Sequence, residues 1–350
     1  MVHDFNFMTT LIGSFPHREP DQIIGKILAS ADIPAWPQLP RRDFRESIYV
    51  QYSASLPCTV LDSQAGKVSF DTRGDVTPAL ERFYEAYLAE DLDAFALQPE
   101  FGAGFYAMLA ALSSTPGQWC KGHVMGPISF GLTVTDQDLR ASLYDEQLAD
   151  VIVKNMAMQA RWQVRKLKAV RPKVILFVDE PYMASYGSAF IAVNREQAIT
   201  YMDEAFKAIH AEGGLAGVHC CGNTDWSVLM DTQVDILNLD AQSFIENLSL
   251  YPAALRRFLD RGGTVAWGIL PNDARALEAT PQNIAADLIQ GLKLVVRRAE
   301  TQGVAISMDE FAPRSLLTPA CGLGSTDEAV AARVLELLAP TRQAVLELLI

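Results

Sequence analysis

Short apolar runs alternate along the chain with longer stretches in which apolar residues recur at helical spacing. Runs of this length, rich in β-branched residues, predict strands, whereas recurrence every three to four residues predicts helices that bury one face. Strands are predicted at 9–14, 58–61, 121–126, 173–178, 215–218, 236–239, 265–270 and 316–318. Helices are predicted at 21–29, 78–90, 144–170, 195–211, 253–261, 281–301 and 326–350.

This alternation favours repeated βα units around a parallel sheet. A chain of 350 residues with 49% apolar residues can bury a large core, and no internal repeat or low-complexity linker suggests a boundary. We therefore expect an α/β protein, a single TIM (β/α)8 barrel spanning residues 1–350. The segment 34–74 is rich in Pro, Arg and Gln without clear periodicity, and is predicted to be an irregular insertion near the N-terminus.

Several polar residues stand at or just beyond the C-terminal ends of the predicted strands. They are Ser14, Asp179, His219, Cys221, Asp240 and Cys321. In a parallel barrel these strand ends form one rim, which is where the active site is built. Residues that are far apart in the sequence are thus expected to converge.

His219 and Cys221 follow the apolar run 213–218. Alternate side chains of a strand face the same way, so these two should project together and Cys220 to the opposite side. Imidazole and thiolate are zinc ligands, and a catalytic zinc has three protein ligands and one open position, which makes Cys321 the third candidate. The alternative is that these are ordinary buried residues without a metal.

Four separated segments, in the same order, resemble the catalytic barrel of cobalamin-independent methionine synthase. They are TTLIGSFP at 9–16, KGHVMGP at 121–127, VDEP at 178–181 and PACGL at 319–323. The stretch HCCGNT at 219–224 is also similar to zinc-thiol methyltransferases that use methylated corrinoids, within the uroporphyrinogen-decarboxylase-like superfamily. The resemblance implies a zinc-dependent methyl transfer to a thiol, most simply homocysteine, giving methionine.

The resemblance also implies roles in binding homocysteine. Asp179 corresponds to the carboxylate that holds the ammonium group, while Ile12, Gly13 and Ser14 supply contacts to the substrate carboxylate. Glycine suits such a contact because it lets the backbone approach a ligand closely. Glu46 is the best match to a further carboxylate in the family, the alternative being a solvated charged loop.

Asp240 stands where the family has a glutamate, and is expected to fill the fourth zinc position reversibly, unless it only caps the next helix. A substrate thiol that displaces it would be held as the nucleophilic thiolate. The folate-dependent family members also carry a catalytic histidine in a later segment, but no histidine follows His219 here. Asp273 in that segment could be the acid only if burial raised its pKa. We therefore expect a methylated corrinoid, such as methylcobalamin on a corrinoid protein, as donor.

Other interpretations remain open at the level of sequence. The thiol could be another one, such as coenzyme M; the donor could be methyltetrahydrofolate; or the chain could be a non-catalytic partner of a corrinoid protein. The net charge of −13 argues against nucleic acid and anionic membrane surfaces as partners. Five cysteines without a disulfide-like cluster, and an N-terminus unlike a signal peptide, lead us to expect a cytoplasmic protein.

Overall fold

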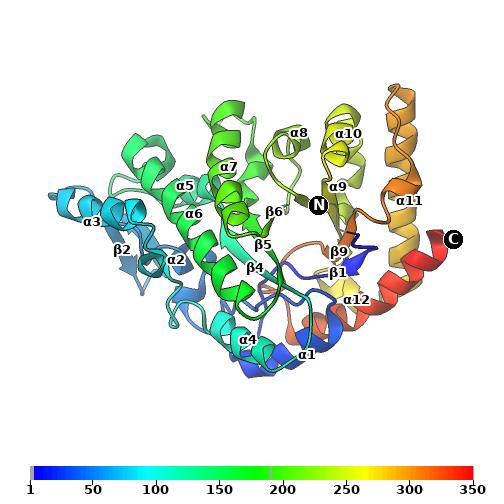
Figure 1. Cartoon of the computed structure of the whole chain (residues 1–350), viewed down its shortest axis with the longest axis horizontal. Helices are drawn as coiled ribbons and strands as arrows, with labels where there is room; N and C mark the ends of the chain where they lie inside the picture. The colour runs from blue at the N-terminus through cyan, green and yellow to red at the C-terminus, as the bar shows by residue number, and fades with distance from the viewer. Residues whose placement is uncertain (1–3, 190, 350) are drawn as a thin grey trace.

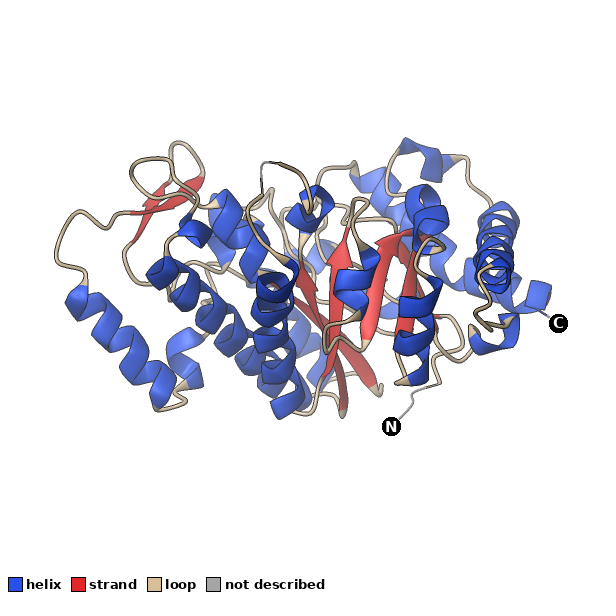
Figure 2. Cartoon of the chain, turned by 90° about the horizontal axis from the view of Figure 1, so that it is seen from above, coloured by secondary structure: helices blue, strands red, loops and turns tan. Residues whose placement is uncertain are grey.

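The computed structural model describes residues 4–189 and 191–349 and contains a curled parallel sheet enclosed by helices (Figures 1 and 2). Seven parallel strands are hydrogen-bonded in the order β1-β9-β8-β7-β6-β5-β4. They are β1 (Met8–Thr9), β4 (Trp119–Met125), β5 (Lys173–Asp179), β6 (Leu215–Cys220), β7 (Ile236–Asp240), β8 (Thr264–Leu270) and β9 (Ser315–Pro319). The predicted TIM-barrel class is confirmed.

The eighth position of the barrel, between β1 and β4, is filled by the extended segment 33–38. On one side the Ile33 N–H donates to the Thr9 carbonyl at 3.0 Å, and on the other the Lys121 N–H donates to the Pro34 carbonyl at 2.8 Å. The two prolines of this segment have no N–H to donate, so the ladder is interrupted and no continuous strand forms. These bonds nevertheless close the barrel.

The prediction that 58–61 forms a barrel strand is wrong. This stretch lies largely in β2 (Thr59–Asp62), which pairs antiparallel with β3 (Lys67–Phe70) in a separate two-stranded ribbon. Val60 and Leu61 are 48% and 39% exposed, so the apolar run is not a core strand. The second barrel strand instead comes from the segment predicted to be irregular, because prolines hide its strand pattern.

All seven predicted helices are present; α7 and α11 have the predicted bounds, and the other five differ by a few residues at their ends. They are α1 (Ile24–Ser30), α3 (Thr77–Leu88), α6 (Glu146–Lys168), α7 (Arg195–Ala211), α10 (Pro252–Asp260), α11 (Pro281–Thr301) and α12 (Glu328–Leu349). The expected end of the last helix at Ile350 lies outside the described residues. Further short helices are α2 (Ile48–Gln51), α4 (Ala103–Ser113), α5 (Pro127–Thr133), α8 (Trp226–Met230) and α9 (Ala241–Leu248).

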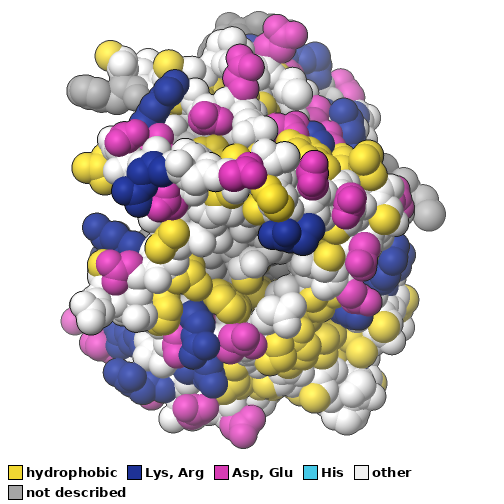
Figure 3. All heavy atoms as spheres, turned by 90° about the vertical axis from the view of Figure 1, so that its left-hand side faces the viewer, with side chains coloured by type: hydrophobic (Ala, Val, Ile, Leu, Met, Phe, Trp, Pro, Cys, Tyr) yellow, Lys and Arg dark blue, Asp and Glu magenta, His cyan; other side chains and the backbone are white. Residues whose placement is uncertain are grey.

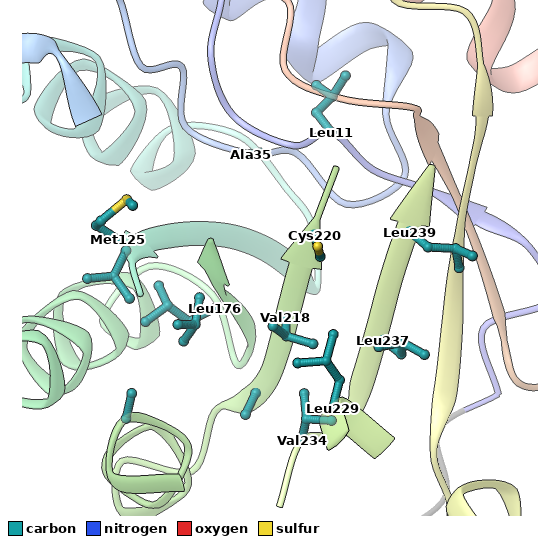
Figure 4. Packing of buried hydrophobic residues seen from close by; sticks show 14 of the residues in the cluster. Leu11, Ala35, Met125, Leu176, Val218, Cys220, Leu229, Val234, Leu237 and Leu239 are labelled. Atoms are coloured by element: carbon teal, nitrogen blue, oxygen red, sulfur yellow. The ribbon is translucent and has the colours of Figure 1, made fainter. Parts of the chain in front are cut away.

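Alternation along the strands divides the core into two layers. One layer lies between the sheet and the helices, and Figure 4 shows Val218 and Cys220 of β6 in it, beside Leu237 and Leu239 of β7. The other fills the inside of the barrel. It contains Phe5, Ile33, Trp119, Ile175, Phe177, Ile236, Ala266 and Leu316. Side chains of the opposite phase to Cys220, including that of His219, therefore face the barrel interior.

In the described part of the chain, no helix combines the length and the apolar character needed to span a membrane. Figure 3 shows one face of the molecule, on which acidic and basic side chains are interspersed. The described residues of this face thus form no extended basic patch of the kind that neutralises nucleic-acid phosphates.

Candidate active site

Three soft donor groups meet at the C-terminal rim of the barrel. His219 is near the end of β6, Cys221 follows that strand directly, and Cys321 lies two residues beyond β9. Their ligand atoms all lie within 4.8 Å of one another, and His219 Nε2 is 3.7 Å from Cys321 Sγ. A tetrahedral zinc with bonds of about 2.0 to 2.3 Å would separate its ligand atoms by about 3.5 to 3.8 Å. The donor types and their spacing fit a zinc ion.

The orientation of the His219 ring is fixed by Asn238, one strand over on β7. Asn238 Nδ2 donates to the Ala266 carbonyl at 2.8 Å and to Thr318 Oγ1 at 2.9 Å, which leaves its Oδ1 facing the imidazole. His219 Nδ1 lies 2.5 Å from this oxygen and therefore carries the proton. The lone pair of Nε2 is then directed at the sulfur atoms, as in metal sites where a second residue orients the histidine.

The protonation states of these three groups also suit the binding of a cation. Burial lowers the pKa of His219 to about 4, so its imidazole is neutral near pH 7. The Cys321 thiol hydrogen-bonds to Cys221 and lowers the pKa of Cys221 to about 7, and the same contact raises the pKa of Cys321. The two sulfurs thus share one proton near neutral pH.

The strand phase predicted for this stretch is confirmed by Cys220, which lies in the layer beneath the helices and not in the site (Figure 4). It is fully buried, and burial raises the pKa of its thiol to about 12. A thiol in such surroundings is neither nucleophilic nor available to metal.

A cavity of about 470 Å³ adjoins the three donor groups and is also lined by Ile12, Gly13, Ser14 and Asp179. The structure thus brings together these predicted substrate-binding residues, although their role stays a prediction. Asp179 ends β5 and is 6% exposed, and its Oδ1 has no hydrogen-bond partner. Burial raises the pKa of Asp179 to about 7, against the opposing attraction of the buried Lys121. A buried carboxylate oxygen without a partner is costly unless a ligand occupies the cavity.

Lys121 supports the pocket from inside the barrel, a role that sequence reasoning missed. It is fully buried, its Nζ donates to the Ile12 carbonyl at 2.7 Å, and it lies 4.1 Å from the centre of the Phe177 ring. Burial lowers its pKa to about 7, opposed by Asp179. The signal that could have revealed it is a lysine inside an otherwise apolar strand, in phase with inward-facing positions.

Glu180, next to Asp179, has a structural task. Its carboxylate accepts hydrogen bonds from the Ile128 N–H at 3.0 Å, the Ser129 N–H at 2.8 Å and the Ser129 hydroxyl at 2.5 Å. It therefore covers the N-terminal end of α5, whose unpaired amides need acceptors. The Asp-Glu-Pro motif places one carboxylate in the pocket and uses the other to hold the N-terminal end of α5.

Glu46 does not line the pocket. It ends the 3-10 helix η2 (Phe44–Glu46) and is fully buried; Oε2 accepts from the Leu39 N–H at 3.2 Å, and Oε1 pairs with Arg42 Nη1 at 3.2 Å. The structure therefore shows Glu46 neither at the pocket, where a substrate contact was expected, nor in a solvated loop. The carboxylate instead fixes the conformation of 39–46, because its two oxygens satisfy the backbone and the arginine.

The two remaining aspartates cap helices. Asp240 precedes α9, accepts from the Ser243 N–H at 3.0 Å, and is not among the three clustered donor groups. Its role as a reversible zinc ligand stays a prediction. Asp273 caps the 3-10 helix η6 (Ala274–Leu277), and its side chain is 51% exposed in an ion pair with Arg275 at 2.9 Å. That hydrogen-bonded pair lowers the pKa of Asp273, so the buried acid envisaged from the sequence is not present.

No family model matches the sequence, and no curated protein matches it by sequence. Solved structures do resemble the fold. The match to a B12-independent methionine synthase from Shewanella sp. W3-18-1, in complex with selenomethionine, has a TM-score of 0.53 and 15% identity over 100% of this chain and 99% of that one. A methyltransferase from Methanosarcina mazei gives 0.52 and 13%, over 94% and 86%. At these identities the likeness establishes the fold.

Proposed function

We propose that this protein is a zinc-dependent methyltransferase that converts homocysteine to methionine. The observation that carries the proposal is that one cavity contains both a soft three-donor cluster and, on Asp179, a buried carboxylate oxygen without a partner. A thiol that also carries an ammonium group satisfies both features. The Shewanella and Methanosarcina proteins of the same fold are a methionine synthase and a methyltransferase, which supports the reaction type.

Different residues would bind the metal and the substrate. His219, Cys221 and Cys321 would hold zinc, which when bound stabilises the substrate sulfur as a thiolate nucleophile near neutral pH. Asp179 pairs with the ammonium group and so fixes the amino-acid end of the substrate. Anchoring both ends aligns the sulfur for in-line attack on a methyl group, and such positioning supplies several kcal/mol of the barrier.

For the methyl donor we propose a methylated corrinoid, presented by a corrinoid protein at the open rim. In this transfer the new S–C bond takes the sulfur electron pair, while the pair of the broken Co–C bond stays on the reduced cobalt, so no proton is needed. A tertiary folate amine would need a general acid. Asp273 is exposed and ionised, and burial lowers the pKa of the pocket histidine His123 well below its usual value, so Asp273 holds no proton and the neutral imidazole is too weak an acid for this task.

The alternatives differ in measurable ways. Coenzyme M carries a sulfonate and no ammonium, so it would leave Asp179 unpaired, which favours homocysteine. A non-catalytic partner of a corrinoid protein would transfer no methyl group to any thiol. The Shewanella protein is B12-independent, so the donor must be tested directly.

The experiment is a methyl-transfer assay with zinc-loaded protein, crossing homocysteine and coenzyme M with methylcobalamin and methyltetrahydrofolate. We expect methionine from homocysteine and methylcobalamin, and a loss of turnover in Cys321→Ser. Efficient turnover with the folate and none with the corrinoid would refute the donor. Methylation of coenzyme M without methylation of homocysteine would refute homocysteine as the acceptor. Full activity without zinc would refute the zinc-dependent mechanism.

A further inference from the structure

His123 on β4 is a buried polar side chain whose two ring nitrogens both lack a partner. It is 1% exposed, neither Nδ1 nor Nε2 makes a hydrogen bond within the described protein, and the residue lines the same cavity as Asp179. An imidazole withheld from water in this way is destabilising unless something in the cavity satisfies its hydrogen bonds. The metal-binding cluster does not include this histidine.

The ring is held in place from several sides. It stacks on Trp36 at a centroid distance of 3.8 Å and an interplanar angle of 22°, and the His123 carbonyl accepts from the Tyr52 hydroxyl at 2.8 Å and from Gln163 Nε2 at 2.9 Å. A Cβ atom at Gly13 would lie 2.6 Å from His123 Nδ1. The glycine at position 13 thus makes room for the imidazole, which is rigidly positioned before any ligand arrives.

The position of His123 relative to Asp179 suits a small zwitterion. In the parallel β4–β5 ladder His123 pairs with Phe177, two residues before Asp179. Two residues of a strand span roughly 7 Å, and neighbouring strands lie roughly 5 Å apart. A ligand can therefore lie between the imidazole and the carboxylate.

The charge state of His123 decides what it can recognise. Burial, assisted by the neighbouring Lys121, keeps the pKa of His123 well below its usual value, so the ring is neutral and has one N–H donor. Such a donor pairs with an acceptor on the ligand, whereas Asp179 pairs with a cation. An α-amino acid carries both groups on one carbon.

We propose that His123 is a substrate-binding residue whose N–H hydrogen-bonds to the carboxylate of an amino-acid thiol while Asp179 holds its ammonium group. This assignment rests on the proposed function and deepens it. It predicts that recognition of the substrate carboxylate depends on His123 and recognition of the ammonium on Asp179, and that the two can be separated by removing one group from the ligand at a time.

The test uses calorimetric binding of three thiols to zinc-loaded protein: homocysteine, 4-mercaptobutyrate, which lacks the ammonium, and 3-mercaptopropylamine, which lacks the carboxylate. His123→Phe keeps a ring on Trp36 and removes the nitrogens. We expect it to weaken homocysteine and 4-mercaptobutyrate by about 10- to 100-fold, as for a hydrogen bond to a charged group, and to change 3-mercaptopropylamine by less than about twofold. Asp179→Asn should weaken homocysteine and 3-mercaptopropylamine and spare 4-mercaptobutyrate.

Zinc content and melting temperature, measured on each variant, show whether the site is intact. His123→Asn is a second variant that restores a side-chain N–H, and we expect it to keep more homocysteine affinity than the phenylalanine variant. An equal loss for all three thiols in His123→Phe, or no loss for homocysteine, would overturn the proposal. If wild-type protein binds none of the three thiols, the proposed function fails as well, and the wild-type measurement alone reveals this.

Discussion

The structure predicts that Asn238 controls zinc affinity although it would not touch the metal. Replacing Asn238 by alanine removes the acceptor 2.5 Å from His219 Nδ1 and the two donations to Ala266 and Thr318 at 2.8 and 2.9 Å. The ring then loses both its tautomer preference and its orientation. Loss of such a supporting residue typically costs 10- to 100-fold in metal affinity, or about 1.4 to 2.7 kcal/mol.

The measurement is a zinc dissociation constant from competition with a chromophoric chelator, together with the melting temperature of the metal-free protein. The metal-free variant should also be less stable than metal-free wild type, because the groups that lose their hydrogen bonds to Asn238 are buried and each unsatisfied group costs about 1 to 3 kcal/mol. Thr318→Val gives a graded comparison, since it removes only one contact of Asn238 and should cost less than tenfold in zinc affinity. A folded Asn238→Ala protein that binds zinc as tightly as wild type would refute the proposed orientation of His219.

Three further predictions concern the same site. Elemental analysis should find about one zinc per chain, lost in Cys221→Ser and Cys321→Ser and kept in Cys220→Ser; equal loss in the last would contradict the strand phase. His219 is already neutral above about pH 4, whereas the pKa of Cys221 is near 7. Zinc binding should therefore release about two protons below pH 7 and about one above it, so that zinc affinity rises with pH. A pH-independent zinc affinity would argue against thiolate ligands. Asp179→Asn should weaken homocysteine binding by about 30-fold or more with zinc retained, and unchanged calorimetric binding would remove Asp179 from the substrate site.

The sequence was sufficient to predict which side chains converge, because that outcome follows from backbone geometry. Strand alternation decides that His219 and Cys221 face inward while Cys220 does not, and a parallel barrel brings all strand ends to one rim. Cys321 could therefore be placed near them although the two segments are about a hundred residues apart. The sequence could not decide whether Asp240 binds zinc or only caps a helix, because an aspartate at a strand end suits both roles equally well.

What the sequence did not reveal depends on partners that only the folded chain provides. The segment 33–38 contains two prolines, so its periodicity is lost, and Pro34 and Pro37 can accept backbone hydrogen bonds but cannot donate them. Glu46 lies among charges that are typical of exposed loops, yet it is buried because Arg42 and a backbone amide satisfy it. Asn238 is a neutral residue within an apolar run, and its importance appears only beside His219.

The proline-containing segment 33–38 is only weakly hydrogen-bonded to its neighbours in the barrel wall. Between β4 and β5 seven residue pairs are in register, whereas the segment 33–38 is joined to its two neighbours by a few isolated backbone bonds. Opening a small number of hydrogen bonds costs less than breaking a full ladder, so local fluctuations concentrate there and amide exchange should be fastest along this wall. His123 lies on β4, on one side of this segment, and Gly13 lies in the stretch that follows β1, on the other. The barrel wall is therefore expected to open first along 33–38, whereas His123 stays anchored because its strand β4 pairs with β5 along its whole length.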